Sequence, residues 1–302
     1  MSVEAPSRLT SGLLLAAAGS IAFSGKAIIV KLAYRYGVDA VTLIMYRMLF
    51  ALPLFLAMTW WATCRARTPV VPLTRRDWLG ILGLGVSGYY LASFLDFWGL
   101  QYISASLERL ILYLNPTLVL VLGWVLYGRR ITPRQAGAMA LSYAGVLLVF
   151  GHELRFDGWS TALGAGLVFA SAISYAIYLV YSGEMVKRLG ALRLVGWATT
   201  VACLLCLLQF VLLRPLSAAL VAPEVIWLSV LNAVACTAAP VVMVMMAIER
   251  IGSGLTAQTG MVGPMSTILM GVWILGEPFN GWVLAGTVLV LAGVLWVTRQ
   301  RA

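Results

Sequence analysis

Five ionisable side chains lie within segments that are otherwise apolar, and these residues are the first candidates for chemistry in the chain. They are Lys26, Arg47, Asp96, Glu108 and Arg109. A charge at the middle of a membrane-spanning helix costs about 2.5–3.5 kcal/mol on the insertion scale, so such residues are informative. Asp96 and Glu108 could take up and release protons, because a carboxyl group in an apolar environment favours its neutral form. The sequence leaves two alternatives open for the group, a solute-binding vestibule or a structural network of paired and interface-seeking charges.

Neutral polar and aromatic residues follow the same helical faces. Tyr89 shares a face with Ser93 and Asp96, and a polar stripe with the spacing i, i+3, i+4, i+7 and i+11 runs from Ser171 to Ser182. That stripe includes Tyr175 and Tyr178, and its regularity predicts that it faces the interior of a helix bundle. Tyrosines can close over a flat or cationic ligand, although they can also simply pack.

Two prolines interrupt apolar segments, and each is preceded by polar residues. Pro116 follows Asn115, which shares a helix face with Glu108, and Pro264 follows Gln258 and Thr259. A proline removes one backbone hydrogen bond and prevents a regular turn, so a freed carbonyl could contact a ligand. A simple packing kink is the alternative. We therefore expect Asn115, Gln258 and Thr259 beside the five charges and three tyrosines in a central site, at helix breaks near Pro116 and Pro264.

The elements that must position these residues are membrane helices. The chain of 302 residues is 62% hydrophobic and 11% charged, which excludes soluble globular and disordered proteins. A membrane span needs about 20 mostly apolar residues, and irregular backbone cannot face lipid. Ten segments meet this requirement: 10–33, 41–62, 78–101, 104–127, 131–150, 161–183, 193–213, 225–248, 253–276 and 279–298. The first is expected to be retained, since no cleavable signal peptide is evident.

The basic residues predict the orientation of these segments. With the amino terminus inside, 14 Lys and Arg residues fall on the inner side and 4 on the outer side, which places both termini in the cytoplasm. The net charge of +10 does not indicate nucleic-acid binding, because the basic residues occupy connections between apolar segments. In this orientation the five intramembrane charges lie in the outer part of the membrane, and we expect their vestibule to open outward.

The chain contains an internal duplication. A shift of 148 positions places Pro116 on Pro264, Gly128 on Gly276, and the run from Ala144 to Leu147 on the run from Ala292 to Leu295. Trp78-Leu79 recurs as Trp227-Leu228. Since five spans carry the chain across the membrane, the second half enters inverted. We therefore predict an all-α membrane protein with ten helices in two inverted repeats, residues 10–151 and 161–299, related by a pseudo-twofold axis.

These motifs resemble the drug/metabolite transporter superfamily, and within it the EamA-type ten-helix proteins. The resemblance is carried by Ser104-Ala105-Ser106, Asn115-Pro116 and Tyr127-Gly128-Arg129 in the first half. Its counterparts in the second half are Gly252-Ser253-Gly254, Gly263-Pro264 and Leu275-Gly276-Glu277. The hinge acid of the family is kept at Glu277 but replaced by Arg129. The resemblance implies a secondary transporter, with a leaning toward export of amino acids, their derivatives, nucleobases or toxic compounds across the inner membrane.

Other classes of function find little support in the sequence. No nucleotide-binding loop is present, so an ion or substrate gradient must supply the energy, with protons as one candidate. A membrane-embedded enzyme would need catalytic pairs or metal ligands, whereas His152 is the sole histidine and is expected in a loop. Cys203 and Cys206 are expected to pack rather than bind metal. We expect no cofactor and a small-molecule substrate, and we leave open a homodimer and a scaffold or sensor function.

Overall fold

The computed structural model describes residues 4–64, 72–128, 130–260 and 262–299, and this part of the chain is helical without a strand. The first half contains α1 (Glu4–Tyr34), α2 (Ala40–Cys64), α3 (Arg75–Leu84), η1 (Gly85–Leu91), α4 (Ala92–Gly99), α5 (Ala105–Leu112), α6 (Asn115–Tyr127) and α7 (Pro133–Asp157). The second contains α8 (Trp159–Leu189), α9 (Ala191–Leu213), η2 (Leu216–Ala219), α10 (Pro223–Ala233), η3 (Val234–Ala238), α11 (Ala239–Thr259), α12 (Val262–Met270), η4 (Gly271–Leu275) and α13 (Gly281–Arg299).

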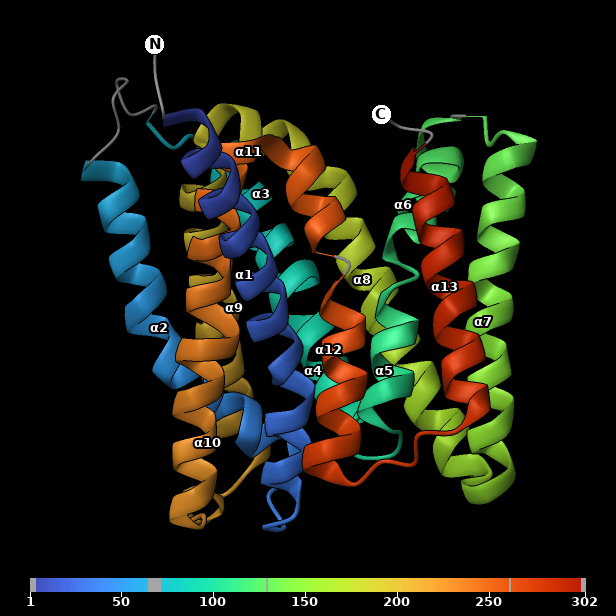
Figure 1. The fold of residues 1–302 in the computed structure, drawn as a ribbon. Coiled ribbons are helices and arrows are strands. Elements are labelled where there is room, and N and C mark those ends of the chain that lie inside the picture. Colours follow the sequence, from blue (N-terminus) through green and yellow to red (C-terminus); the bar gives the residue numbers. More distant parts are fainter. Residues whose placement is uncertain (1–3, 65–71, 129, 261, 300–302) are drawn as a thin grey trace.

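The predicted all-α membrane protein is confirmed. Within the described ranges, 8 helices are long and apolar enough to cross a membrane, and two shorter apolar helices, Met265–Leu275 and Gly281–Trp296, are consistent with the ten spans expected. Figure 1 shows the start of α1 and the end of α13 on the same side of the bundle, hereafter the terminus side. The chain reaches the opposite side at the end of α7, so the second set of five spans runs in the reverse direction.

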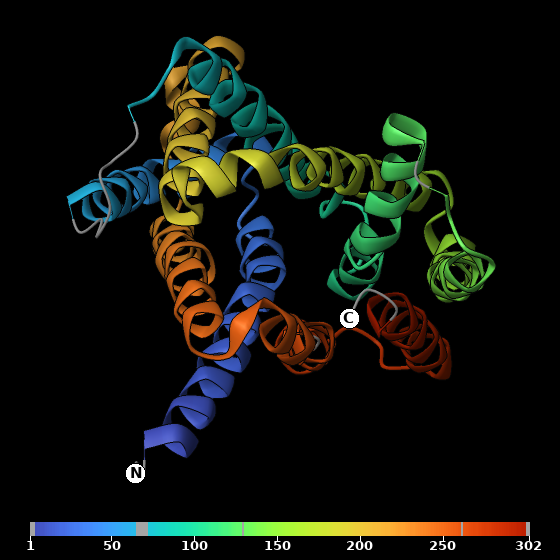
Figure 2. The same ribbon diagram turned by 90° about the horizontal axis from the view of Figure 1, so that it is seen from above.

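Helices of the two halves pair with their own counterparts. The second spans meet as α2 and α9, the fourth and ninth spans meet where α5 packs on α12, and the fifth and tenth meet as α7 and α13. The third span of each half packs on the first span of the other half, through α4 on α8 and α10 on α1. Figure 2 shows the α7–α13 pair standing at one edge of the bundle. This reciprocal pattern is what a twofold relation between inverted repeats requires.

Glycines allow the closest of these approaches. A β-carbon at Gly145 on α7 would lie 2.6 Å from the carbonyl oxygen of Gly286 on α13, and one at Gly286 would lie 2.7 Å from the carbonyl oxygen of Gly145. Only residues without a side chain permit this backbone contact, the usual means by which membrane helices associate. The duplicated hinge glycines have a different role, because Gly128 and Gly276 end their helices with φ of 64° and 74°.

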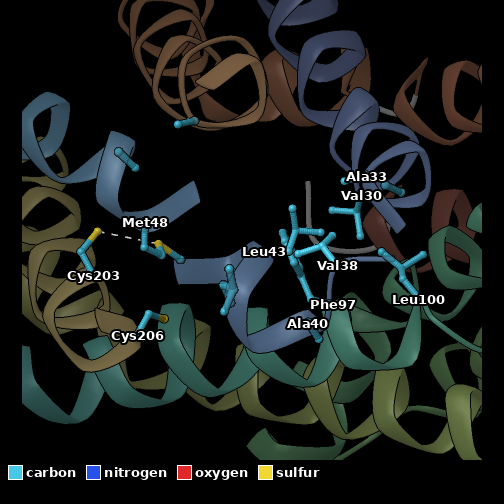
Figure 3. Close-up of a cluster of buried hydrophobic side chains, with 14 of the residues drawn as sticks. Val30, Ala33, Val38, Ala40, Leu43, Met48, Phe97, Leu100, Cys203 and Cys206 are labelled. Carbon is cyan, nitrogen blue, oxygen red and sulfur yellow. Dashed lines mark hydrogen bonds between the residues drawn. The ribbon is translucent and has the colours of Figure 1, made fainter. Parts of the chain in front are cut away.

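The largest hydrophobic core lies between α1, α2, α4 and α9. Figure 3 shows part of it, with Met48 on α2 beside Cys203 on α9, whose thiol donates to the Met48 sulfur at 3.7 Å. Cys203 and Cys206 are both free and buried in this core. No group of three potential metal ligands occurs among the residues that were described. Cys203 and Cys206 pack among the apolar side chains of this core.

Three features depart from the expected segments. The expected connection between the eighth and ninth spans is helical, because α11 continues to Thr259 and bends over the terminus side (Figure 1). The Gly252-Ser253-Gly254 run within α11 is of the kind that permits sharp bends. His152 lies within α7 rather than in a loop, near Trp282 with ring centroids 6.0 Å apart. The third span of each half contains a π-helical segment, η1 and η3, at equivalent positions.

Candidate functional site

Four of the five intramembrane charges form one buried cluster at the centre of the first half. Lys26 on α1 lies 2.5 Å from Asp96 on α4 and 3.5 Å from Glu108 on α5. The Arg109 Nε atom lies 3.9 Å from the Glu108 carboxylate. Glu108 is 0% exposed and Asp96 is 2% exposed. Lys26 is 8% exposed and its ammonium pairs with these two acids inside the bundle, an arrangement that favours a paired network over an interface-seeking lysine.

Arg109 ties the cluster to the second half. Its Nε donates to the Thr267 hydroxyl on α12 at 3.0 Å, and its Nη2 donates to the carbonyls of Phe23 and Ser24 on α1 at 3.4 Å each. Thr267 gave no sequence signal, because a threonine in an apolar helix can satisfy its hydroxyl on its own backbone. In this structure the Thr267 hydroxyl accepts from Arg109 and also donates to the Gly263 carbonyl of its own helix at 3.3 Å.

Arg47 on α2 stands apart from these ion pairs. Its Nε donates to the Thr237 hydroxyl in η3 at 3.2 Å, and its guanidinium carbon lies 5.1 Å from the centre of the Phe97 ring. The side chain is 5% exposed, and its Nη1 has no hydrogen-bond partner in the described structure. Arg47 is therefore a buried cation whose direct contacts are neutral groups, with the charge of Asp96 acting on it from a longer distance.

A cavity of about 510 Å³ lies between the two halves and collects most of the predicted site residues. Its lining includes eight of them: Lys26, Arg47, Tyr89, Asp96, Arg109, Asn115, Tyr175 and Tyr178. Glu108 is not part of the lining and lies behind Lys26 and Arg109. Thr259 lines neither this cavity nor the adjoining groove, and the side chain of Gln258 falls outside the described part of the chain.

Three tyrosines form one wall of the cavity. Tyr89 and Tyr178 join their hydroxyls at 3.2 Å with their rings edge to face, and the rings of Tyr175 and Tyr178 stack with centroids 5.5 Å apart. The predicted serine stripe supports this wall, since Ser171 and Ser174 on α8 donate to carbonyls of the third span at 2.7 Å. Tyrosine rings with paired hydroxyls offer a flat, weakly polar surface to a ligand.

The two π-helical segments bring matched positions into the cavity. Gly88 in η1 and Thr237 in η3 lie ten residues after the recurring Trp78 and Trp227, and both line the cavity. A β-carbon at Gly88 would lie 2.4 Å from the Tyr178 ring, so glycine is required for the tyrosine wall. A π-helical turn widens the helix and occurs often at functional sites. Sequence periodicity did not reveal these turns, because one extra residue in a helix changes apolar spacing too little.

The duplicated prolines follow matched breaks in the fourth and ninth spans. Asn115 begins α6 after a break at Tyr113 and Leu114, and α12 begins after a break that follows Thr259. Side chains satisfy the carbonyls at these breaks. The Asn115 amide donates to the Leu112 carbonyl at 2.7 Å, and the Gly260 carbonyl accepts from the hydroxyls of Ser20 at 2.6 Å and Tyr113 at 3.2 Å. The expected free carbonyls are therefore already used within the protein.

The cavity adjoins a groove of about 340 Å³, with which it shares Phe23, Arg109, Tyr113 and Val244. The groove follows the middle of α1, from Ala16 to Ser24, and reaches Thr256 near the end of α11, which bends over the terminus side. A larger hollow of about 950 Å³ on the opposite side shares no lining residue with the cavity. The lining residues thus link the cavity to the groove and not to this hollow, and the outward opening of the vestibule stays a prediction.

Glu277 joins the two halves by hydrogen bonds on the side opposite the termini, hereafter the closed side. Its carboxylate accepts from the backbone N–H of Ala105 at 2.6 Å and of Ser106 at 3.2 Å, and from the Ser106 hydroxyl at 2.8 Å. These donors form the first turn of α5 in the first half, whereas Glu277 belongs to the second half. A carboxylate at a helix amino terminus is favourable through both hydrogen bonds and the helix dipole. Its counterpart Arg129 lies outside the described residues.

Known proteins resemble the chain over most of its length. The model of the EamA-like transporter family matches residues 10–151 and again residues 162–299. A Bacillus subtilis protein named uncharacterized transporter YcbK is 30% identical over 281 residues, covering 88% of this chain and 86% of that protein. An uncharacterized transporter of Archaeoglobus fulgidus is 24% identical and covers 95% of this chain. One solved crystal structure has the same fold, with a TM-score of 0.65 at 18% identity over 96% of this chain and 97% of that one.

Proposed function

The chain belongs to the EamA-like transporter family, and we propose that it is a secondary active transporter that exports a small organic solute. The solute classes favoured by this membership are amino acids, their derivatives, nucleobases and toxic compounds. We place it in the inner membrane with both termini in the cytoplasm, where most of its basic residues then lie. Its repeats are residues 10–151 and 161–299, and they alternate access to the cavity between them.

One observation carries this proposal. The cavity of about 510 Å³ between the halves carries charged and aromatic side chains, shares lining residues with the adjoining groove, and shares none with the hollow on the other side. A central site that is open at one end and closed at the other is the state from which alternating access begins. In the proposed orientation this state faces the cytoplasm and is ready to load a solute for export.

We assign the coupling role to the buried acids, with protons as the coupling ion. Neither oxygen of the Glu108 carboxylate has a hydrogen-bond donor in the described structure, and its ion pairs with Lys26 and Arg109 are 3.5 and 3.9 Å long. A buried carboxyl group with so little stabilisation of its charge is suited to binding a proton. Protonation of Glu108 would remove its ion pairs with Lys26 and Arg109, and Arg109 contacts both halves through Thr267 and the carbonyls of Phe23 and Ser24.

A flux assay tests the proposal. The purified protein is reconstituted into liposomes, and exchange of a panel of radiolabelled metabolites is followed with and without a pH gradient. We expect saturable flux of at least one solute, faster with the gradient. Absence of flux for every solute, from a protein that is folded by thermal melting, would contradict transport and favour a scaffold or sensor.

Variants of the buried acids test the coupling role. Asp96→Asn and Glu108→Gln should each reduce gradient-driven flux by about tenfold or more, because each removes a charge that lines or supports the cavity. Glu224→Gln is the matched control, since Glu224 is exposed in the first turn of α10. Wild-type flux in all three variants would exclude the acids from the transport cycle.

A further inference from the structure

The charges at the cavity do not cancel. The lining contains three cations, Lys26, Arg47 and Arg109, and one acid, Asp96, among the described residues. Glu108 behind the lining supplies a second acid. Lys26 pairs with Asp96 and Arg109 pairs with Glu108, at the distances given above. Three cations against two acids leave one positive charge, and Arg47 is the cation for which no ion pair occurs among the described residues.

Arg47 has no directly bonded anion among the residues described, and only the more distant charge of Asp96 acts on it. In the described ranges no carboxylate lies within 4.0 Å of it. A hydroxyl and an aromatic ring are its only polar contacts there, through Thr237 and Phe97. Its Nη1 has no hydrogen-bond partner although the side chain is 95% removed from solvent, being 5% exposed. An unpaired buried charge is strongly unfavourable, so an arrangement of this kind is expected where a bound ligand supplies the counter-ion.

We propose that Arg47 binds the carboxylate of the transported solute, and this inference rests on the proposed transport function. A guanidinium matches a carboxylate with two parallel hydrogen bonds. One unpaired cation balances a single negative charge, which favours a monocarboxylate over a phosphate dianion. A solute that is only cationic would meet a cavity with an excess of positive charge.

Two further groups define the rest of the ligand. Asp96 lines the same cavity, and its buried Oδ1 atom has no hydrogen-bond partner among the described residues, so we assign to it an N–H or O–H of the ligand. The wall of Tyr89, Tyr175 and Tyr178 presents aromatic rings to the ligand's body. The cavity of about 510 Å³ is within the size range of small-molecule sites. The class of ligand is therefore a small carboxylic acid with a flat, apolar body.

Matched acid and amide probes test this inference by binding. The full-length protein in detergent is melted with 3-phenylpropionate or with 3-phenylpropionamide, which share a shape but differ in charge. A ligand that binds the folded state raises the melting temperature in proportion to its affinity. We expect the acid to bind wild type about 10- to 100-fold more tightly than the amide, since a hydrogen-bonded charge pair is lost with the amide. Equal affinities, or no binding of the acid at millimolar concentration, would overturn the proposal.

Variants of Arg47 assign the preference to this residue. Arg47→Gln should remove the preference for the acid, whereas Arg47→Lys should retain part of it because the positive charge remains. The control is Arg76→Gln, at an exposed position in α3. An undiminished preference in Arg47→Gln would refute the assignment. The comparison of the two probes on wild type decides the matter if that variant does not fold.

A flux measurement separates this inference from the proposed function. Binding of the acid through Arg47 without flux of any solute would contradict transport and leave the anion site standing. Flux of neutral solutes that is the same in wild type and in Arg47→Gln, with no preference for acids, would support transport and refute the anion site.

Discussion

Replacing Glu277 with glutamine should open the side of the protein opposite the termini. The Glu277 carboxylate accepts three hydrogen bonds, at 2.6, 3.2 and 2.8 Å, from Ala105 and Ser106 in the other half. These bonds exist only while that side is closed, because separation of the halves there would break them. Glutamine preserves the shape of the side chain but removes its charge and one acceptor oxygen.

The magnitude follows from these contacts. A hydrogen bond to a charged group contributes about 1.5–3 kcal/mol, and Glu277 is only half-buried, so the lower value applies. A loss of about 1.4 kcal/mol changes a conformational equilibrium about tenfold. The population open on that side should therefore rise about tenfold in Glu277→Gln, and Ser106→Ala, which removes one of the three bonds, should give a smaller increase.

Cysteine accessibility measures this population. Ile103 lines the hollow on the closed side and is 2% exposed, so Ile103→Cys should react slowly with a membrane-impermeant maleimide. The exposed Cys64 is replaced by serine, and the other three cysteines are buried. Labelling of Ile103→Cys should be about tenfold faster when Glu277→Gln is added. An unchanged rate, or an equal increase with Glu224→Gln, would refute the role of Glu277 in closure.

Two further predictions concern the tyrosine wall and the loop before α2. Gly88→Ala should cost about 1–3 kcal/mol and weaken solute binding, because its β-carbon would meet the Tyr178 ring at 2.4 Å, whereas Gly83→Ala, whose β-carbon meets no atom within 4 Å, should leave both melting and binding unchanged. Equal effects of the two substitutions would disprove the steric argument. Burial opposes the charge of Asp39, but hydrogen bonds from Thr42 and Val41 and the charge of Arg214 outweigh this and lower its pKa. Stability from Asp39 is thus present above its unfolded pKa of about 3.9 and lost as pH falls through the lower folded value. The side chains of Asp39 and Arg214 are both more than a third exposed, so their ion pair contributes a few tenths of a kcal/mol to stability. The cap that Asp39 forms at the start of α2 contributes about 1 kcal/mol. Asp39→Asn should therefore melt close to wild type at pH 7 while losing part of the acid sensitivity, and a melting curve with the same acid dependence in the variant would contradict this assignment.

The sequence was sufficient to predict the architecture and family, because both depend on patterns that extend over many residues. Twenty apolar residues in a row require a helix in the membrane, and the match of Pro116 to Pro264 identifies the duplication. The predicted family is confirmed by the two matched segments. The cost of burying charge likewise identified Lys26, Asp96 and Glu108, which the structure brings together.

Other features depend on contacts between distant segments, which one sequence does not reveal. Thr237 and Thr267 became visible only as partners of Arg47 and Arg109. The open end of the cavity depends on how helices from both halves lean together, and the depth of a residue along its own helix carries no such information. The sequence predicts Arg47 in one site with the other four intramembrane charges, and only the interatomic distances in the structure show that it forms no ion pair with them.

The reciprocal packing of the halves constrains how the protein is made. The Gly145 face of α7 finds its partner on α13, a helix that is synthesised more than a hundred residues later. Until α13 is inserted, the Gly145 face of α7 must therefore contact lipid. A cell that received the two halves as separate polypeptides should still assemble the bundle, whereas either polypeptide alone should be degraded.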